Sequence, residues 1–185
     1  MQNNKNSKES DENYTPNTEK QPVINLVLKV FGGTIDLDPC SNSLDSPNVP
    51  AEIHYTKEIN SLGLLWWGKV FLNPPYSNAL PFMENLVYSY QTGATKEAIA
   101  LLKVGTMNNK GTGKLIEDHA SAVCFWNAKN RRIGFINPAG EQRKKANFDC
   151  VLVYFGANWQ WFREVFSPWG HVMATNKTIN QLLQP

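Results

Sequence analysis

The string Asn73-Pro74-Pro75-Tyr76, read within KVFLNPPYSN, has the clearest chemical potential in this sequence. It follows a β-type run and precedes an amphipathic helix pattern. Two consecutive prolines hold φ at about −65° and remove two N–H donors, so the loop has a fixed shape. An amide that donates and accepts, together with a flat aromatic ring, suits a planar substrate that bears an amino group. The alternative is an ordinary proline-rich turn with a half-buried tyrosine.

A second polar strand end lies earlier in the chain. Thr34–Asp38 is expected to be a short strand, and Asp38-Pro39-Cys40-Ser41 follows it. In open α/β sheets, ligands bind outside the carboxyl ends of the strands, where the strand order reverses. If this strand and the strand Lys69–Leu72 are parallel neighbours, one crevice receives both loops. A cofactor at the first loop would then face a substrate at the second.

Alternating strand and helix patterns surround these loops. Helices are expected from Pro22, from Pro81, over Lys110–Ala120 and over Asn158–Phe166, and further strands over Glu97–Val104, Ser121–Trp126, Arg131–Ile136 and Asp149–Phe155. Residues 40–53 are rich in turn formers. This order predicts an α/β fold with a mostly parallel sheet. The last two strands are close enough in sequence to form an antiparallel hairpin at one edge.

Length and composition suit one domain with a sizeable core. We expect a disordered polar tail over 1–12, a single domain over 13–170 and a C-terminal tail over 171–185. No apolar run is long enough for a membrane span, and no apolar segment of a secretory signal follows Met1. The 3 cysteines and 3 histidines are scattered, so neither a disulfide framework nor a metal site is expected. A reduced intracellular setting is the natural interpretation.

Positive charge gathers in one third of the chain. Residues 101–150 hold 9 basic and 4 acidic groups, whereas residues 21–100 hold 4 basic and 7 acidic groups. This asymmetry fits a nucleic-acid face, and on charge alone it fits a solvated lysine-rich loop equally well. The candidate phosphate contacts are Lys103, Lys110, Lys114, Arg131, Arg132, Arg143, Lys144 and Lys145. The loop from Asn137 to Phe148 is a candidate DNA clamp.

The ordered set DLDPCSN, then NSLGLLWWGKVFLNPPYS, then VLVYFG resembles the phage-type Dam-like DNA N6-adenine methyltransferases. The resemblance covers about residues 13–156 and includes a Tyr14-Thr15-Pro16 lead-in. It implies a Rossmann-like fold and S-adenosylmethionine (SAM) as the methyl donor. It also implies DNA as the partner, in a phage or prophage product that works in the bacterial cytoplasm.

The same resemblance assigns roles around the second loop. The side-chain oxygen of Asn73 and the carbonyl of Pro74 would accept hydrogen bonds from the adenine N6 amino group. These bonds favour a nitrogen whose lone pair points at the methyl group. Tyr76 would stack on the base after it leaves the duplex, and Pro75 would fix the loop. Ser77 is the next position and a candidate contact with the DNA backbone.

On the cofactor side, Asp38-Pro39-Cys40 takes the place of a glycine-rich loop. Asp38 would bind the amino group of the methionine moiety, and Asp36 lies two residues earlier on the same strand face. The alternative for Asp36 is a strand-edge salt bridge. Asn60 stands where such folds read the cofactor adenine, although an Asp is more usual there. The remaining candidates are Tyr14 and Thr15, which would close over the cofactor unless they are tail residues, and Glu52 and Glu58, for the ribose.

Three other functions remain open from the sequence. A glutamine-amide methyltransferase acting on protein also uses NPPY, and a catalytically silent DNA-binding module would keep the fold. Cytosine N4 methylation is chemically close, although it more often uses SPPY or DPPY. The basic third of the chain favours DNA over a protein substrate. The recognised DNA sequence and the oligomeric state are left open.

Overall fold

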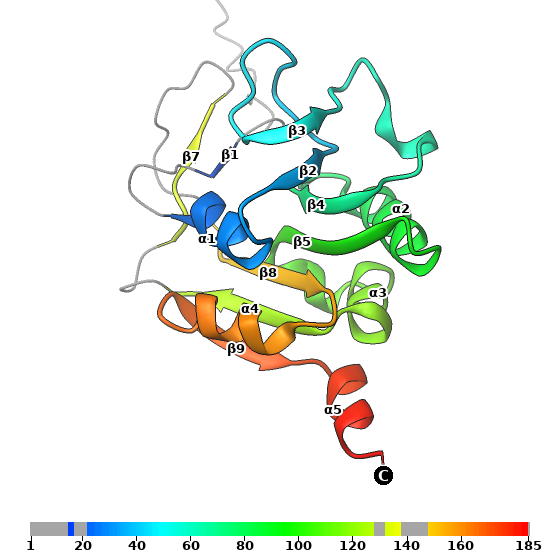
Figure 1. The fold of residues 1–185 in the computed structure, drawn as a ribbon, viewed down its shortest axis with the longest axis vertical. Coiled ribbons are helices and arrows are strands. Elements are labelled where there is room, and N and C mark those ends of the chain that lie inside the picture. The colour runs from blue at the N-terminus through cyan, green and yellow to red at the C-terminus, as the bar shows by residue number, and fades with distance from the viewer. Residues whose placement is uncertain (1–14, 17–21, 128–131, 138–147, 185) are drawn as a thin grey trace, which may run out of the picture.

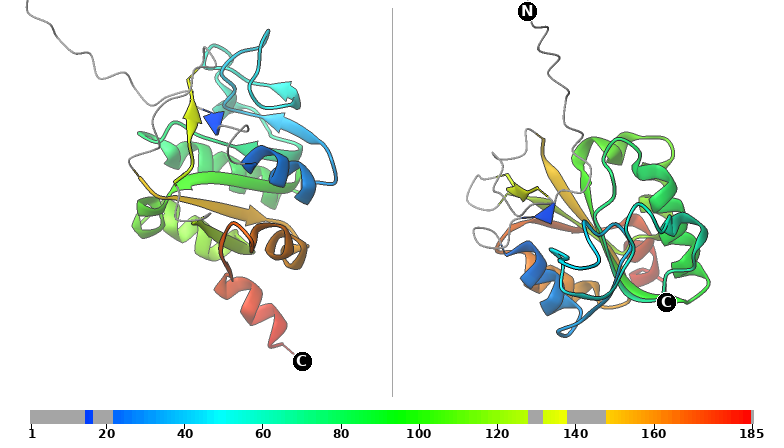
Figure 2. Two further views of the ribbon diagram at one scale, coloured as in Figure 1. Left: turned by 90° about the vertical axis from the view of Figure 1, so that its left-hand side faces the viewer. Right: turned by 90° about the horizontal axis from the view of Figure 1, so that it is seen from above.

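The computed structural model describes residues 15–16, 22–127, 132–137 and 148–184, which form an α/β fold of three layers (Figure 1). A mixed sheet of seven strands is the middle layer. Helices α1 (Val23–Val30) and α4 (Trp159–Phe166) pack on one face of it. Helices α2 (Ala79–Gln91) and α3 (Thr112–His119) pack on the other. Figure 2, seen from above, shows the sheet between these layers.

The sheet combines a parallel half with an antiparallel half. In spatial order its strands are β3 (Ala51–His54), β2 (Ile35–Asp38), β4 (Gly68–Leu72), β5 (Thr95–Lys103), β8 (Cys150–Phe155), β6 (Ala122–Trp126) and β9 (Gly170–Ala174). The first four strands are parallel to one another. Strand β8 runs antiparallel to both of its neighbours, and β9 runs antiparallel to β6. The α/β class is therefore confirmed, with a sheet that is mixed.

The predicted edge hairpin is wrong. Strand β8 lies inside the sheet, paired with β5 on one side and β6 on the other. All six of its residues are buried, with alternate side chains in the two hydrophobic clusters. A strand that is apolar on both faces must be covered on both faces, which an edge hairpin would not provide. The strand predicted over Arg131–Ile136 as its hairpin partner contains β7 (Phe135–Ile136). Strand β7 pairs antiparallel with β1 (Thr15–Pro16) in a separate two-stranded sheet.

Three elements appear where no regular structure was expected. Strand β3 ends the turn-rich segment 40–53 and pairs with β2. The segment 171–185, expected to be a tail, supplies most of β9 and the helix α5 (Asn176–Leu182). Both strands lie at the edges of the sheet, and neither is fully buried. Short, half-exposed strands carry a weak apolar pattern, so pairing rather than composition defines them.

Side chains along β5 alternate between the two faces of the sheet, and this alternation places Lys103 at the edge where the loops meet. Ile99 and Leu101 point to the α1/α4 face, whereas Ala98, Ala100 and Leu102 point to the α2/α3 face. Because side chains alternate along a strand, Lys103 continues the first series. It is the last residue of β5, at the same edge as the carboxyl ends of the parallel strands β2 and β4.

Candidate active site

The two polar strand ends lie side by side, as predicted. Strands β2 and β4 are parallel neighbours, with Leu37 paired to Val70. The chain passes from β2 outward to β3 and then returns to the other side of β2 as β4, so the strand order reverses at this pair. Parallel neighbours end at the same edge, and this edge carries the loops that follow Asp38 and Leu72. The crevice expected at such a reversal is therefore present.

A cavity of about 280 Å³ opens between these loops. Its walls come from four segments: Pro39–Ser41 after β2, Thr56 and Lys57 after β3, Asn60–Leu62, and Pro75, Asn78 and Phe82 after β4. The lining combines residues that carry hydroxyl, amide or ammonium groups with the apolar residues Leu62, Pro75 and Phe82. A pocket that is apolar with a few placed polar groups is typical of sites for small molecules and cofactors.

Asp38 is buried under the loop that follows β2 and is hydrogen-bonded to it. Its carboxylate is 2% exposed and accepts a hydrogen bond from the Cys40 backbone N–H, at 3.1 Å. Burial raises the pKa of Asp38 to about 7, although the Cys40 N–H bond opposes this rise. Burial, and then the charge of Asp38, raises the pKa of the Cys40 thiol well above its usual range. Cys40 is therefore a neutral thiol on the cavity wall, and Asp38 is a buried carboxyl directly behind that wall.

The segment around Asn60 is tied to the same loop. Asn60 has a left-handed backbone, with φ at 49°, and lines the cavity. The hydroxyl of Ser61 donates to the Pro39 carbonyl at 3.0 Å, and the indole N–H of Trp66 donates to the Ser61 carbonyl at 3.0 Å. Sequence reasoning placed Asn60 in the site but did not find the Ser61 and Trp66 bonds that hold it there. These bonds join the two loops into one rigid wall.

The NPPY loop is held by its own side chains. The Tyr76 hydroxyl donates to Asn73 Oδ1 at 3.0 Å, which fixes the amide orientation. The Asn78 backbone N–H donates to the Pro75 carbonyl at 3.0 Å, and this turn leads into α2 at Ala79. Of the loop residues, Pro75 and Asn78 line the cavity. Tyr76 is half-buried on the α1/α4 face of the sheet.

An aromatic cluster that sequence reasoning missed surrounds Tyr76. Its ring meets Phe148 edge-on, with centroids 5.1 Å apart and planes at 72°, and Phe135 with centroids 6.1 Å apart and planes at 89°. The Lys103 ammonium lies 5.2 Å from the Tyr76 centroid and 4.4 Å from that of Phe148. These residues come from four separate segments, so no local spacing in the sequence signals the cluster.

Several predicted cofactor residues lie elsewhere. Asp36 Oδ2 accepts from the Lys69 backbone N–H at 2.7 Å, near the start of β4 and away from the cavity. The Lys69 ammonium donates to the Phe31 carbonyl beside it. Thr15 is buried in β1 opposite Ile136 and does not line the cavity. The two ribose candidates, Glu52 and Glu58, are exposed and also absent from its wall, and Tyr14 lies outside the described residues.

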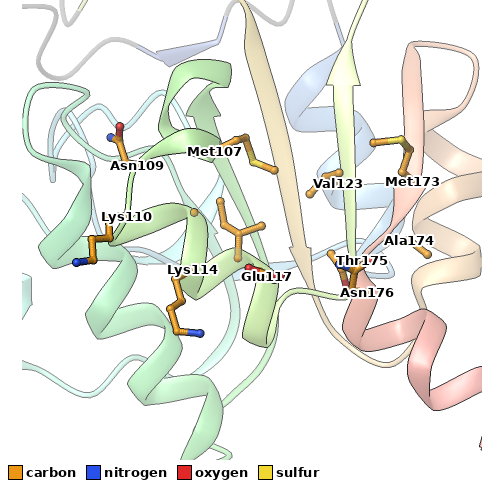
Figure 3. Close-up of a pocket in the computed structure, with 12 residues that line it drawn as sticks. Met107, Asn109, Lys110, Lys114, Glu117, Val123, Met173, Ala174, Thr175 and Asn176 are labelled. Atoms are coloured by element: carbon orange, nitrogen blue, oxygen red, sulfur yellow. The ribbon is translucent and has the colours of Figure 1, made fainter.

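The other candidate DNA contacts lie in separate places. Lys110 and Lys114 line a second, open cavity of about 480 Å³ between α3 and the β6–β9 edge (Figure 3). Lys114 pairs there with Asp118 at 2.8 Å, and Arg132 pairs with Asp149 at 2.8 Å, so both charges are partly neutralised. Ser77 is exposed beside Tyr76. Arg131, Arg143, Lys144 and Lys145 lie outside the described residues.

The segment that contains Lys110 contacts the start of α2, the helix that follows the NPPY loop. Its neighbour Gly111 packs against Leu80 in the first turn of α2, where an added Cβ would lie 2.8 Å from Leu80 Cδ1. The loop before α3 therefore abuts the segment that follows Asn78. Among the described residues, no group of histidine, cysteine and acidic side chains could hold a metal ion. Nor does that part of the chain include a helix long and apolar enough to cross a membrane.

Comparison with known proteins identifies the family. The sequence profile of the family described as DNA N-6-adenine-methyltransferase (Dam) matches residues 2–179, which include both strand-end loops. The chain belongs to this family. Membership of the Dam family confirms the predicted resemblance and the predicted activity class, a DNA (adenine-N6)-methyltransferase. The chain is also similar to a protein of Haemophilus phage HP1 (strain HP1c1) named DNA N-6-adenine-methyltransferase, with 29% identity over 168 residues, 86% of this chain and 84% of that protein.

Proposed function

We propose that this Dam-family chain transfers a methyl group from SAM to the N6 amino group of a flipped adenine, at the edge where β2 and β4 end. One observation carries the proposal: Pro39–Ser41 after β2 and Pro75 of the NPPY loop line one and the same cavity. A donor held by the first loop would therefore lie beside an acceptor held by the second. The strand order, reversing between β2 and β4, supports a Rossmann-like sheet for this chain.

The donor side has groups that fit SAM. The methionine part of SAM carries an α-ammonium, and the buried Asp38 carboxyl has a raised pKa because burial disfavours its charge. A cation placed next to it would favour that charge. Asn60, Ser61 and Leu62 offer polar and apolar groups for the adenosine part, and Thr56 and Lys57 lie nearby on the wall. When bound, SAM supplies an electrophilic methyl group on a sulfonium.

The acceptor side positions a weak nucleophile. The adenine N6 lone pair is delocalised into the ring, so it must be turned toward the methyl group. An amide oxygen accepts two hydrogen bonds. The Tyr76 bond to Asn73 Oδ1 can therefore orient the amide while Oδ1 accepts from the adenine amino group. The Pro74 carbonyl would accept a hydrogen bond from the second N–H of the amino group. This is electrostatic preorganisation of a fixed loop, without a covalent enzyme intermediate.

DNA would approach the edge that carries these loops. Ser77 directly follows the NPPY loop, and Gly111, the neighbour of Lys110, packs against Leu80 at the start of α2. Lys110, Arg131, Arg143, Lys144 and Lys145 stay candidates for phosphate contacts, as does Arg132 in spite of its bond to Asp149. The family match favours DNA over a protein glutamine as substrate and over a silent module. With a phage relative, the bacterial cytoplasm is the proposed place of action.

A product analysis tests this function. Purified protein is incubated with labelled SAM and with unmodified DNA or a protein extract, and the products are digested to nucleosides and amino acids. Label in N6-methyladenine is the expected result. Label in cytosine or in protein would contradict the proposed substrate. DNA binding without any label would support the silent module.

A further inference from the structure

Lys103, which the sequence analysis names as a candidate phosphate contact, lies in the aromatic cluster around Tyr76. It ends β5 on the α1/α4 face, where the apolar series Ile99 and Leu101 gives way to a cation. The β5–β8 ladder fixes its backbone, since Lys103 is paired with Cys150 and the next amide, Val104 N–H, donates to the Asp149 carbonyl at 2.9 Å. The position is therefore rigid at the backbone and half-buried at the side chain.

The ammonium of Lys103 lies against aromatic rings. Its Nζ is 4.4 Å from the Phe148 centroid and 5.2 Å from that of Tyr76. Asp149, the residue before β8, is paired with Arg132. Among the described residues, no carboxylate forms an ion pair with Lys103. A lysine in this setting has a weaker partner than a phosphate oxygen, which forms a charge-assisted hydrogen bond.

The rings that Lys103 covers border the proposed acceptor. Tyr76 follows the two prolines of the NPPY loop and bonds Asn73. A base stacked on Tyr76 needs a face of that ring, and the phosphates of the same nucleotide must lie within a nucleotide's length of it. The flexible four-carbon stem of lysine allows Nζ to move while the Cα stays in β5. The ammonium can thus leave the rings for a phosphate without any change in the sheet.

We propose that Lys103 is a positioning residue which covers the Tyr76–Phe148 pair in the free protein and moves to a phosphate of the flipped nucleotide when DNA binds. This inference rests on the proposed function and adds a named residue to it. The exchange links two events: the phosphate contact draws the cation away, and the ring faces become available to the base. Lys103 would then contribute to DNA affinity more than to the methyl-transfer step.

The test replaces the charge and keeps the stem. Lys103→Met removes the ammonium, Lys103→Arg restores a cation, and Lys96→Met serves as the matched control, because Lys96 lies on β5 at the opposite end and its Nζ bonds the Gly93 carbonyl. The dissociation constant for unmethylated plasmid DNA is measured over a range of salt concentrations, with S-adenosylhomocysteine present. Methyl transfer to the same DNA gives KM and kcat.

We expect Lys103→Met to weaken DNA binding about tenfold near 0.1 M salt and to reduce the slope of log K against log salt by about 0.9, the effect of one lost phosphate contact. KM for DNA should rise by a larger factor than kcat falls, Lys103→Arg should restore most of the slope, and Lys96→Met should leave it unchanged. An unaltered slope in Lys103→Met overturns the inference. Because wild-type N6-methyladenine is measured in parallel, its absence would instead reject the proposed function.

Discussion

Replacing Asp38 with asparagine tests how much the buried carboxylate at the end of β2 lowers the free energy of unfolding. Burial raises the pKa of Asp38 from 3.8 to about 7, and its side chain is 2% exposed. A difference of about three pKa units corresponds to about 4 kcal/mol, since one unit is about 1.4 kcal/mol. Asparagine has no charge to bury, and its Oδ1 can still accept from the Cys40 N–H. Asp38→Asn should therefore be more stable than the wild type at neutral pH.

The pH dependence follows from the direction of the shift. Because the folded protein binds this proton more tightly than the unfolded chain, the stabilisation from Asp38 is complete below about pH 4 and is lost as pH rises through about 7. The free energy of unfolding of Asp38→Asn, relative to wild type, should rise by about 1.4 kcal/mol per pH unit over this window. Above it, the difference should level off.

Urea and thermal unfolding between about pH 5 and pH 8 measure this difference. For a chain of this size, about 4 kcal/mol corresponds to roughly 8–16 °C in Tm. The exposed Asp45, in the same loop region, provides Asp45→Asn as the control. With SAM present, the wild type should gain more stability than Asp38→Asn, because the α-ammonium then neutralises the carboxylate. A difference between Asp38→Asn and wild type that stays constant with pH would refute the reasoning.

Three further predictions concern the catalytic loop and the sheet. Asn73→Ala should lower turnover about 100-fold or more while SAM binding, measured by calorimetry, changes less than about twofold; near-wild-type turnover would reject the role of Asn73. Tyr76→Phe keeps the ring but removes its bond to Asn73 Oδ1, so kcat should fall about fivefold, the equivalent of about 1 kcal/mol, and an unchanged kcat would contradict this. Gly68→Ala should lower the free energy of unfolding in urea by about 3 kcal/mol, because φ is +72° and the added Cβ would lie 2.1 Å from Asp36 Oδ2. Gly93→Ala, with φ at +77° and nothing within 4 Å, measures the backbone strain alone, so equal losses in the two variants would exclude the clash.

The meeting of the two strand ends was predictable because parallel neighbours end at one edge of a sheet. The bond between Asp36 and the Lys69 N–H was not predictable. Strand β2 has only four residues, so Asp36, two residues before Asp38, already lies near the end of the strand away from the cavity. The same limit applies to Phe135 and Phe148. They reach Tyr76 through tertiary packing across more than fifty residues of sequence, where periodicity gives no information.

The hairpin error has a different origin. The sequence prediction pairs the β8 segment with the strand before it in the chain, although CVLVYF is apolar at every position. That pattern indicates burial on both faces, and hence a place inside the sheet. The sequence does not predict β9 for the opposite reason. His171 and Met173 are exposed, so the strand has no apolar pattern, and its pairing with β6 defines it. Burial pattern therefore locates interior strands better than it locates edges.

The interior place of β8 has a consequence for how the chain folds. Among the described residues, β8 is the strand that links β5 to β6 in the sheet, although both of those strands are synthesised earlier. Until β8 arrives, β5 and β6 each present an unpaired edge, and the two parts of the sheet cannot join. Insertion of β8 is therefore a late, long-range step, and the β5–β8 amides should be among the slowest in the protein to exchange with solvent. The same step sets Lys103 beside Cys150, so the sheet and its substrate edge are completed together.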